Sequence, residues 1–501
     1  HLTANPHAYH LSPKNGELVN HKHLVVFNRT SFVQNATEVA TSLRYYASGP
    51  GPKIMATAWA TPLTIVLVLG LAAVVTCLST PPEVLVEASS QGMRDFMGLH
   101  YRALHRIPEL KFEEHLTSNK VQSALKELGI KFTAGLAGGT GIIATIGSGR
   151  APVVALRADM DALPVVEPDD VLPSDMQSVH AGKMHACGHD AHMAMLLGAA
   201  RMLQARAASL QGTVLLVFQP GEEGGAGARR MLASSEELRA AHVMFGMHNA
   251  PWVPQGVISS RPGTIMAAST SFHATITGAG GHAAYPHLLV DPVVAAAACI
   301  TALQTLASRE ADPASDGVVV SVTQLHTPSG GAVNVMPDEV VIGGTIRALT
   351  PETFTRIQER VYAIIKAQAE LHRCNASVHS GGRIPYPPVV NDLSLYNIGM
   401  EVATEMFQGD ASKVTVADAP TMGAEDFSFF AQQKPCMFFF LGQANATTGT
   451  DVTLHSRRYK FNEEVLPLGA ALHTAVALHV MSNPPDLWPP RHRFESTRDE
   501  L

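Results

Sequence analysis

Three apolar runs constrain most strongly what this chain can fold into. They are Val-Val-Ala-Leu at residues 153–156, Thr-Val-Leu-Leu-Val-Phe at 213–218 and His-Val-Met-Phe-Gly-Met at 242–247. A strand with one face in solvent alternates apolar and polar residues, whereas a strand buried on both faces does not. A segment rich in Ala, Leu and Met at residues 191–207, typical of a helix, lies between the first two runs. We therefore predict an α/β domain with a central mixed sheet flanked by helices.

A different pattern begins after Gly263. Residues 271–277 alternate like a half-exposed strand, and a helix is expected from Asp291 to Arg309, with Asp291 as its N-cap and Pro292 in its first turn. Further strands at 318–325 and 339–347 and a helix at 351–372 complete this part of the chain. The order strand, helix, strand, strand, helix predicts a compact two-layer α+β unit.

This smaller unit is expected to interrupt the larger one. We place the inserted unit at residues 265–378 and the larger domain at 90–264 and 379–483. A chain of 501 residues is long enough for more than one domain.

Composition excludes several classes of protein. The chain is 46% hydrophobic and only 16% charged, which is the reverse of a disordered sequence. Its net charge of −7 argues against a nucleic-acid partner. Five cysteines are too few for a disulfide scaffold.

The beginning of the chain carries an expected targeting segment. The first methionine is Met55, and the apolar stretch at residues 63–78 is shorter than the roughly 20 residues that a membrane-spanning helix needs. We predict a signal peptide at residues 55–79, with a signal anchor as the alternative, and no stable membrane insertion after cleavage. We interpret residues 1–54 as upstream sequence and leave them out of the fold.

The other end suggests retention in the secretory pathway. Residues 484–501 are expected to form an extended tail, and this tail ends in Arg-Asp-Glu-Leu, similar to the retrieval signal of the endoplasmic reticulum. We therefore expect a protein of the endoplasmic reticulum lumen. Asn375 and Asn445 stand in glycosylation sequons and are candidate glycan acceptors.

Four short segments carry candidate metal ligands. Cys187 and His189 lie two residues apart just before the predicted helix, and a thiolate and an imidazole are good ligands for divalent metals. Glu222 and Glu223 follow a buried strand, where two adjacent carboxylates are costly to bury unless cations neutralise them. His248 is expected at the end of another strand.

The fourth segment is a loop that contains His455. Any one of these residues alone is more often structural. Together, Cys187, His189, Glu223, His248 and His455 could hold two divalent ions if the thiolate bridges them.

Several longer motifs give the chain a specific resemblance. They are Arg-Ala-Asp-Met-Asp-Ala-Leu-Pro (157–164), His-Ala-Cys-Gly-His-Asp (185–190), Gln-Pro-Gly-Glu-Glu (219–223), Gly-Met-His (246–248), Gly-Gly-His-Ala-Ala-Tyr-Pro-His (280–287), Asn-Val-Met-Pro (334–337) and Gly-Ala-Glu-Asp-Phe (423–427). Over residues 91–480 the chain resembles the M20 metallopeptidase family, in particular the amidohydrolase branch with the plant hydrolases of auxin–amino-acid conjugates. The resemblance implies that residues 265–378 form a satellite domain, which acts as a lid or dimerises.

The resemblance also implies roles for individual residues. The two-ion site maps onto Cys187, His189, Glu223, His248 and His455. Manganese is the metal implied by the resemblance, whereas ligand softness favours zinc, and cobalt is a further option.

The general base maps onto Glu222. His282 of the satellite domain would donate a hydrogen bond to the developing oxyanion or to the substrate carboxylate. Asp159 and Asp161 follow a predicted strand and could orient the ligands.

Other polar residues stay open or are read as structural. Asn334 and Arg347 could contact a substrate carboxylate or be an ordinary loop residue and surface residue. His192 and His287 are interpreted as helix or turn structure. Cys299 and Cys374 are read as structural, and Cys436 as a residue of a buried strand.

The implied activity is hydrolysis of the amide bond in N-acyl amino-acid conjugates, with conjugates of indole-3-acetic acid as the leading substrates. A general N-acyl amino-acid deacylase or carboxypeptidase-like hydrolase is the alternative within the class. A catalytically silent binding protein of the lumen is a more distant alternative, because Glu222 and all five mapped ligands are present. The expected partner is a small molecule, with a homodimer through the satellite domain as a further expectation.

Overall fold

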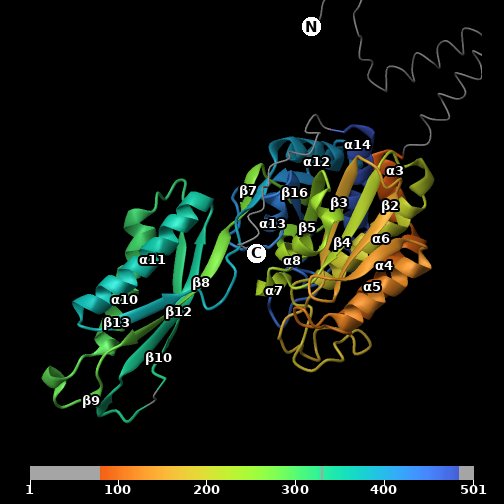
Figure 1. Ribbon diagram of the computed structural model, residues 1–501. Coiled ribbons are helices and arrows are strands. Elements are labelled where there is room, and N and C mark those ends of the chain that lie inside the picture. The colour runs from red at the N-terminus through yellow and green to blue at the C-terminus, as the bar shows by residue number, and fades with distance from the viewer. Residues whose placement is uncertain (1–78, 329–330, 485–501) are drawn as a thin grey trace, which may run out of the picture. The chain divides into compact units, whose positions relative to one another are not determined.

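The computed structural model describes residues 79–328 and 331–484 of the chain (Figure 1). The expectations for residues 1–54, for the signal peptide up to residue 78, and for the C-terminal tail with its retention signal beyond residue 484 therefore concern residues outside the described part. The larger sheet has eight strands in the order β1-β2-β4-β3-β5-β16-β6-β15. Their bounds are β1 (Lys131–Leu136), β2 (Gly141–Gly147), β3 (Val153–Asp159), β4 (Thr213–Gln219), β5 (Val243–Pro254), β6 (Ile258–Ser260), β15 (Val414–Val416) and β16 (Cys436–Ala444).

The centre of this sheet is parallel, as the apolar runs predict. Strand β3 pairs in parallel with both β4 and β5, and β16 continues the parallel set beside β5, whereas β1 and β2 are antiparallel. Alternate side chains of β4 enter two different cores, with Leu216 on one face and Leu215 on the other. The sheet is therefore mixed and buried on both faces, which confirms the predicted fold class.

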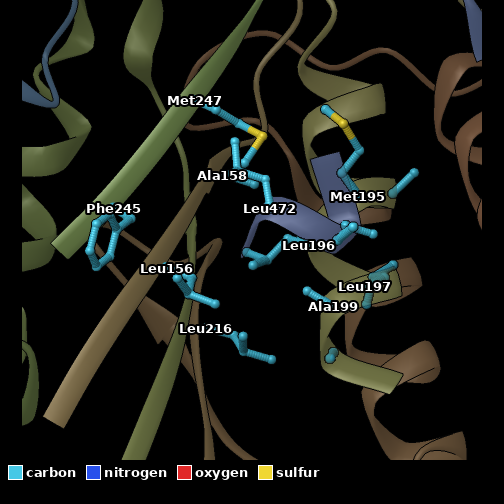
Figure 2. Close-up of a cluster of buried hydrophobic side chains, with 14 of the residues drawn as sticks. Leu156, Ala158, Met195, Leu196, Leu197, Ala199, Leu216, Phe245, Met247 and Leu472 are labelled. Carbon is cyan, nitrogen blue, oxygen red and sulfur yellow. The ribbon is translucent and has the colours of Figure 1, made fainter. Parts of the chain in front are cut away.

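Helices cover the two faces. One core joins the sheet to the helices α3 (Pro81–Ala88), α4 (Gln91–His105), α5 (His115–Glu127), α6 (His189–Gln204), α12 (Leu393–Met406) and α14 (Leu466–Ser482). Figure 2 shows part of this core, where Leu156 and Leu216 of the strands face Leu196 of α6 and Leu472 of α14. The second core contains residues of α8 (Gly227–Ser234) and α13 (Ser428–Ala431). Helix α14 carries apolar residues on all sides and is buried almost throughout, as is typical of such a helix.

The inserted unit has its own sheet and core. Its antiparallel strands run in the order β10-β12-β8-β13, with bounds β8 (Ala268–Thr277), β10 (Val319–His326), β12 (Glu339–Ala348) and β13 (Asn375–His379). Helices α10 (Pro292–Thr305) and α11 (Pro351–Leu371) pack side by side on this sheet (Figure 1). Asp291 caps α10 by accepting hydrogen bonds from the amides of Val293 and Val294, as predicted.

Four details differ from the expectations. Strand β13 adds a fourth strand to the smaller sheet, and this strand ends at His379, the residue near which the larger sheet was expected to resume. Helix α6 begins at His189 instead of residue 191. Strand β5 continues to Pro254, so His248 lies inside a strand and not at its end. Helix α10 ends at Thr305 and is followed by a π-helical turn, Leu306–Glu310.

Short elements complete the described chain. They are α7 (Glu222–Gly225), α9 (Glu236–Arg239), β7 (Gly263–Met266), β9 (Gly281–His282), β11 (Val335–Met336), β14 (Val389–Asn391), η1 (Ala207–Ser209), η2 (Pro286–Leu288) and η4 (Glu463–Val465). Strand β7 pairs with β14, and β9 pairs with β11.

Candidate metal centre

The candidate site lies where three neighbouring parallel strands carry polar residues near one edge of the larger sheet. Asp159 is the last residue of β3 and pairs with Gln219, the last residue of β4. Glu222 follows β4 after two residues, and His248 lies on β5. The carboxyl ends of parallel strands form one edge, which is where α/β sheets bind ligands.

The start of α6 brings two further ligands to this edge. Gly188 adopts a left-handed conformation, with φ 89°, between Cys187 and the first helical residue, His189. A Cβ atom at this position would lie 2.4 Å from Oδ1 of Asn249 and 2.6 Å from the hydroxyl of Tyr459. Only glycine fits this turn without displacing its neighbours. The thiol and the imidazole are thereby presented together.

The side chains of all five predicted metal ligands lie close together at this edge of the larger sheet. Donor atoms of Cys187, His189 and Glu223 lie within 4.8 Å of one another. Nε2 of His248 is 3.3 Å from Sγ of Cys187. Nε2 of His455 is 3.2 Å from Oε1 of Glu223. The side chain of His455 is 53% exposed, so the group has one solvent-facing side.

The local bonding of these residues fits a metal centre. Both ring nitrogens of His189 and Oε1 of Glu223 are buried without a hydrogen-bond partner of normal geometry. Buried polar atoms are nearly always satisfied, so such atoms need an explanation, and an ion is one. Burial raises the pKa of the Cys187 thiol well above its ordinary value, and Glu223 and Glu222 raise it further. A cation between these groups would offset the negative charge and favour the thiolate.

Asp161 positions the two adjacent glutamates through their backbone. Its Oδ1 accepts a hydrogen bond of 2.9 Å from the amide of Glu222, and its Oδ2 accepts one of 2.9 Å from the amide of Glu223. At Glu223 the backbone departs from the helix, with φ −68° and ψ 70°. The two neighbouring carboxylates therefore face different partners.

The carboxylate of Glu222 faces a second acidic group. Oxygen atoms of Glu222, Glu425 and Asp426 lie within 4.8 Å of one another, and all three residues are buried. Burial raises the pKa of Glu222 well above its usual value, and Glu425 and Glu223 add to the rise. A carboxylate held in this way is suited to accept a proton.

A buried arginine balances part of this charge. Arg157 donates hydrogen bonds to Asp159 at 2.8 Å, to Glu425 at 2.8 Å and to Asp426 at 3.2 Å. All of these side chains are almost fully buried. Arg157 thus connects the end of β3 with residues 425 and 426.

His192 has a larger part in the site than the sequence interpretation gave it. It lies in α6, as expected, but its Nδ1 is 2.6 Å from Oδ1 of Asp159 and its Nε2 is 2.7 Å from Oδ1 of Asn249. It also belongs to a buried group of possible ligands with Asp159, His189 and His248. Its ring therefore fixes Asp159 beside His189.

The structure does not bring every candidate residue to this centre. His282 is exposed on β9, and its recorded contacts are local, with the amide of Ala284, the ring of Tyr285 and the paired residue Val335. Asn334 is exposed in the turn before β11. NH1 of Arg347 donates a hydrogen bond of 2.6 Å to the carbonyl of Met422.

The four remaining residues were assigned to structure. His287 lies in the exposed turn η2, in keeping with its interpretation as a turn residue. Cys299 and Cys374 are buried in the core of the smaller unit, and Cys436 is buried in β16, as expected. All four described cysteines, including Cys187, are free.

Sequence reasoning missed several residues that shape the site. Arg157, Glu425 and Asp426 stand within the motifs that carry the family resemblance, so that resemblance was the available signal. Glu114 and Tyr386 stand outside those motifs. They reach the Glu222 loop only through the tertiary fold.

Comparison with known proteins agrees with this geometry. Residues 155–479 match peptidase family M20/M25/M40. The IAA-amino acid hydrolase ILR1-like 2 of Arabidopsis thaliana is 46% identical over 396 residues, which cover 79% of this chain and 87% of that protein. Thermostable carboxypeptidase 2 of Saccharolobus solfataricus is 36% identical over 75% of this chain and 93% of its own length. N-acetyl-L-cysteine deacetylase of Bacillus subtilis is 38% identical over 68% and 79%, respectively.

Solved structures show the same fold. The Bacillus subtilis YXEP protein, described as a dinuclear metal binding peptidase from the M20 family, is 32% identical and superposes with a TM-score of 0.66, covering 79% of this chain and all of that one. A putative aminohydrolase of methicillin-resistant Staphylococcus aureus is 29% identical with a TM-score of 0.70, covering 79% of this chain and 99% of its own.

Proposed function

Because the chain belongs to peptidase family M20/M25/M40, we propose that it is a metal-dependent amidohydrolase that splits N-acyl amino-acid conjugates into the acid and the amino acid. The observation that carries the proposal is the group of Cys187, His189 and the partly buried Glu223, which lies beside the separate carboxylate of Glu222. A metal site next to a carboxylate with a raised pKa is the arrangement that amide hydrolysis needs.

Five residues of this chain would hold two divalent ions. They are Cys187, His189, Glu223, His248 and His455. When bound, such ions lower the pKa of a water molecule and polarise the amide carbonyl. Asp159, Asp161 and His192 keep the ligands in place, because they contact His189 or the backbone of the glutamates.

Glu222 moves the proton in this proposal. It takes a proton from the attacking water and then returns that proton to the nitrogen of the departing amino acid. The carboxylates of Glu425 and Asp426 support this role, because their charge favours the protonated form of Glu222 between the two steps.

Manganese is the proposed metal, by resemblance to the family. The thiolate and imidazole ligands would also suit zinc, and cobalt is a further candidate. Metal content and metal-dependent turnover therefore belong in the first experiment.

Conjugates of indole-3-acetic acid are the proposed substrates, because the relative with 46% identity is named a hydrolase of such conjugates. A broader deacylase or carboxypeptidase is the second candidate, since relatives with those names are 38% and 36% identical. A silent binding protein is disfavoured, because all five ligands and Glu222 are present and adjacent.

One experiment tests these alternatives together. The purified protein is stripped of metal, reloaded with Mn²⁺ or Zn²⁺, and assayed on indole-3-acetyl amino acids, N-acetylcysteine and dipeptides. We expect turnover that requires added metal and is fastest for the indole-3-acetyl conjugates with Mn²⁺. Metal-independent turnover, or no turnover of any amide by metal-loaded protein, would contradict the proposal. Faster cleavage of N-acetylcysteine or dipeptides would favour the second candidate.

Location and assembly are proposed from the sequence. The lumen of the endoplasmic reticulum is supported by the apolar segment at residues 63–78 and by the C-terminal Arg-Asp-Glu-Leu, which lie outside the described residues. Of the two sequons, Asn375 is exposed at the start of β13, whereas the amide nitrogen of Asn445 donates a hydrogen bond to Gln255. Asn375 is therefore the better candidate for a glycan.

A homodimer through residues 265–378 is proposed from the family resemblance.

A further inference from the structure

The loop that carries Glu222 has an unusual backbone. Between β4 and α8 the chain adopts positive φ at Gly221 (65°), Gly224 (75°) and Ala226 (54°). A non-glycine residue such as Ala226 is strained in this conformation, which persists only where surrounding contacts enforce it. The position of the Glu222 carboxylate therefore depends on groups outside the loop.

Two carboxylates hold the first part of this loop. Oε1 of Glu114 accepts a hydrogen bond of 2.9 Å from the amide of Gly221. Asp161 accepts from the next two amides, those of Glu222 and Glu223. These contacts fix amide groups but leave the carbonyl of Glu222 and the amide of Ala226 to other partners.

The hydroxyl of Tyr386 serves both of the remaining groups. It donates a hydrogen bond of 2.6 Å to the carbonyl oxygen of Glu222 and accepts one of 2.9 Å from the amide of Ala226. One atom thus joins the residue that bears the proposed base to the end of the strained segment.

Tyr386 is itself anchored from outside the loop. Its amide and carbonyl both pair with Ser269, at 2.9 Å each. Its ring meets the ring of Phe429 edge-on, with 5.7 Å between the centroids. Burial raises the pKa of Tyr386 above its ordinary value, so the hydroxyl keeps its proton and remains a donor. These contacts leave the hydroxyl little freedom to follow a shifting loop.

We propose that Tyr386 is a positioning residue for Glu222. The hydroxyl of Tyr386 holds the backbone from Glu222 to Ala226 in the one conformation that directs the Glu222 carboxylate at the reacting water. This inference rests on the proposed role of Glu222 as the general base. Without the hydroxyl, a buried carbonyl and a buried amide lose their partner, and the loop shifts to find others. A displacement of about 1 Å at a reacting group costs roughly 100-fold in rate.

The test compares Tyr386→Phe with a matched control, Ser260→Ala. The buried hydroxyl of Ser260 also donates to a carbonyl, that of Phe438 at 2.7 Å, and accepts a hydrogen bond of 3.1 Å from the side-chain amide of Asn391. It lies on β6, which is separated in the sheet by β3, β5 and β16 from β4, the strand that leads into the Glu222 loop. Both variants lose one donor and one acceptor, so their losses of stability should be similar.

We expect Tyr386→Phe to lower kcat by about 10- to 100-fold, with KM and metal content changed less than about threefold. Ser260→Ala should leave kcat within about twofold of the wild type at a similar fall in Tm. If the kcat of Tyr386→Phe is as high as that of Ser260→Ala, the hydroxyl does not position Glu222 and the inference is wrong. The inference is also wrong if Tyr386→Phe loses its bound metal together with its activity.

Two further variants keep the test decisive. Phe429→Leu keeps the hydroxyl of Tyr386 but removes the ring that packs on it, so it should lower kcat by less than Tyr386→Phe does. This variant tests the inference even if Tyr386→Phe fails to fold.

Glu222→Gln separates this inference from the proposed function. If Glu222→Gln is inactive while Tyr386→Phe and Phe429→Leu are fully active, only the positioning role fails. If Glu222→Gln itself is active, the assignment of the base fails.

Discussion

Two adjacent glutamates, Glu222 and Glu223, have different surroundings and are proposed to have different roles. Glu223 touches His455 and belongs to the group with Cys187, whereas Glu222 faces Glu425. The chain bends between them, since Glu223 departs from helical geometry while Asp161 holds both amides. The proposed difference in role therefore rests on backbone direction and surroundings, because the two side chains are chemically the same.

The first prediction separates the two roles. Glu222→Gln keeps the shape of the side chain but removes its ability to carry a proton, so turnover should fall by about 10²–10⁴-fold at unchanged metal content. Glu223→Gln should instead reduce the amount of bound metal, because an amide is a poorer ligand than a carboxylate. Steady-state kinetics and elemental analysis of both proteins check this. Near-normal turnover of Glu222→Gln would show that the assignment within the pair is wrong.

The sequence was informative about the ligands and less so about what holds them. Cys187, His189 and Glu223 stand in dense local motifs of metal-binding residue types, and the structure brings them together. His192 and Asn249 lie in the same motifs or next to them, but their mutual hydrogen bond depends on how α6 meets β5. Such contacts join distant segments, and one sequence contains no local pattern for them.

At the level of elements, the start of α6 matters most for the site. The turn at Gly188 has a positive φ and no room for a Cβ next to Asn249 and Tyr459. It therefore determines how the two flanking side chains, Cys187 and His189, are presented.

The second prediction follows from this turn. Gly188→Ala should lower the free energy of unfolding by about 1–3 kcal/mol and reduce metal content, because the added methyl group displaces the turn. Gly182→Ala is the matched control, since Gly182 also has a positive φ, of 78°, but a Cβ there meets nothing within 4 Å. Thermal unfolding and metal analysis of the two variants check this. An equal effect of both substitutions would show that the crowding at Gly188 is unimportant.

A buried ion pair connects α4 with α6. Nδ1 of His105 is 2.6 Å from Asp190, and its Nε2 is 3.0 Å from Glu167. Burial alone would lower the pKa of His105, but the hydrogen bonds to these two carboxylates outweigh it and raise the pKa to about 9. His105 is thus protonated in the folded protein at neutral pH.

The third prediction concerns the pH dependence of this pair. The folded pKa lies above the unfolded value of about 6.5, so the pair stabilises the fold fully below pH 6.5 and loses this contribution as pH rises through about 9. The stability difference between the wild type and His105→Gln should therefore shrink, by on the order of 3 kcal/mol, between pH 6 and pH 10. Urea unfolding of both proteins across this range measures it. A constant difference would mean that folding does not raise the pKa of His105.

The sequence predicted the elements of the fold unevenly. The apolar runs of β3, β4 and β5 identified the parallel centre, because burial on both faces removes polar residues from a strand. Strand β13 was not predicted, since its alternating residues are half-exposed and only its pairing with β8 makes it a strand. The length of β5 was underestimated, because His248 and Asn249 are polar residues inside a buried strand.

At the scale of the whole molecule, the described residues form two large sheets that do not share a core. The five proposed ligands and Glu222 belong to the larger sheet and its loops, whereas His282 pairs with Val335 in the inserted unit. Within the described residues, no recorded contact joins His282 to the metal centre. A catalytic role for His282 therefore requires that the inserted unit of this chain, or of a partner subunit, presents it during the reaction.

The last prediction tests this role. His282 follows a glycine-rich turn, Gly-Ala-Gly-Gly at residues 278–281, and is exposed, so its ring is available to an incoming carbonyl oxygen. A donor that acts on charge developing in the transition state lowers the barrier without tightening substrate binding. His282→Ala should therefore reduce kcat by about 10²–10³-fold, with little change in KM. The metal content of His282→Ala should equal that of the wild type, because His282 is not among the proposed ligands. The control is His287→Ala: His287 is also exposed but lies in the neighbouring turn η2, so this variant should keep its turnover. Unchanged kcat together with a lower Tm in His282→Ala would mean that this histidine only stabilises its turn.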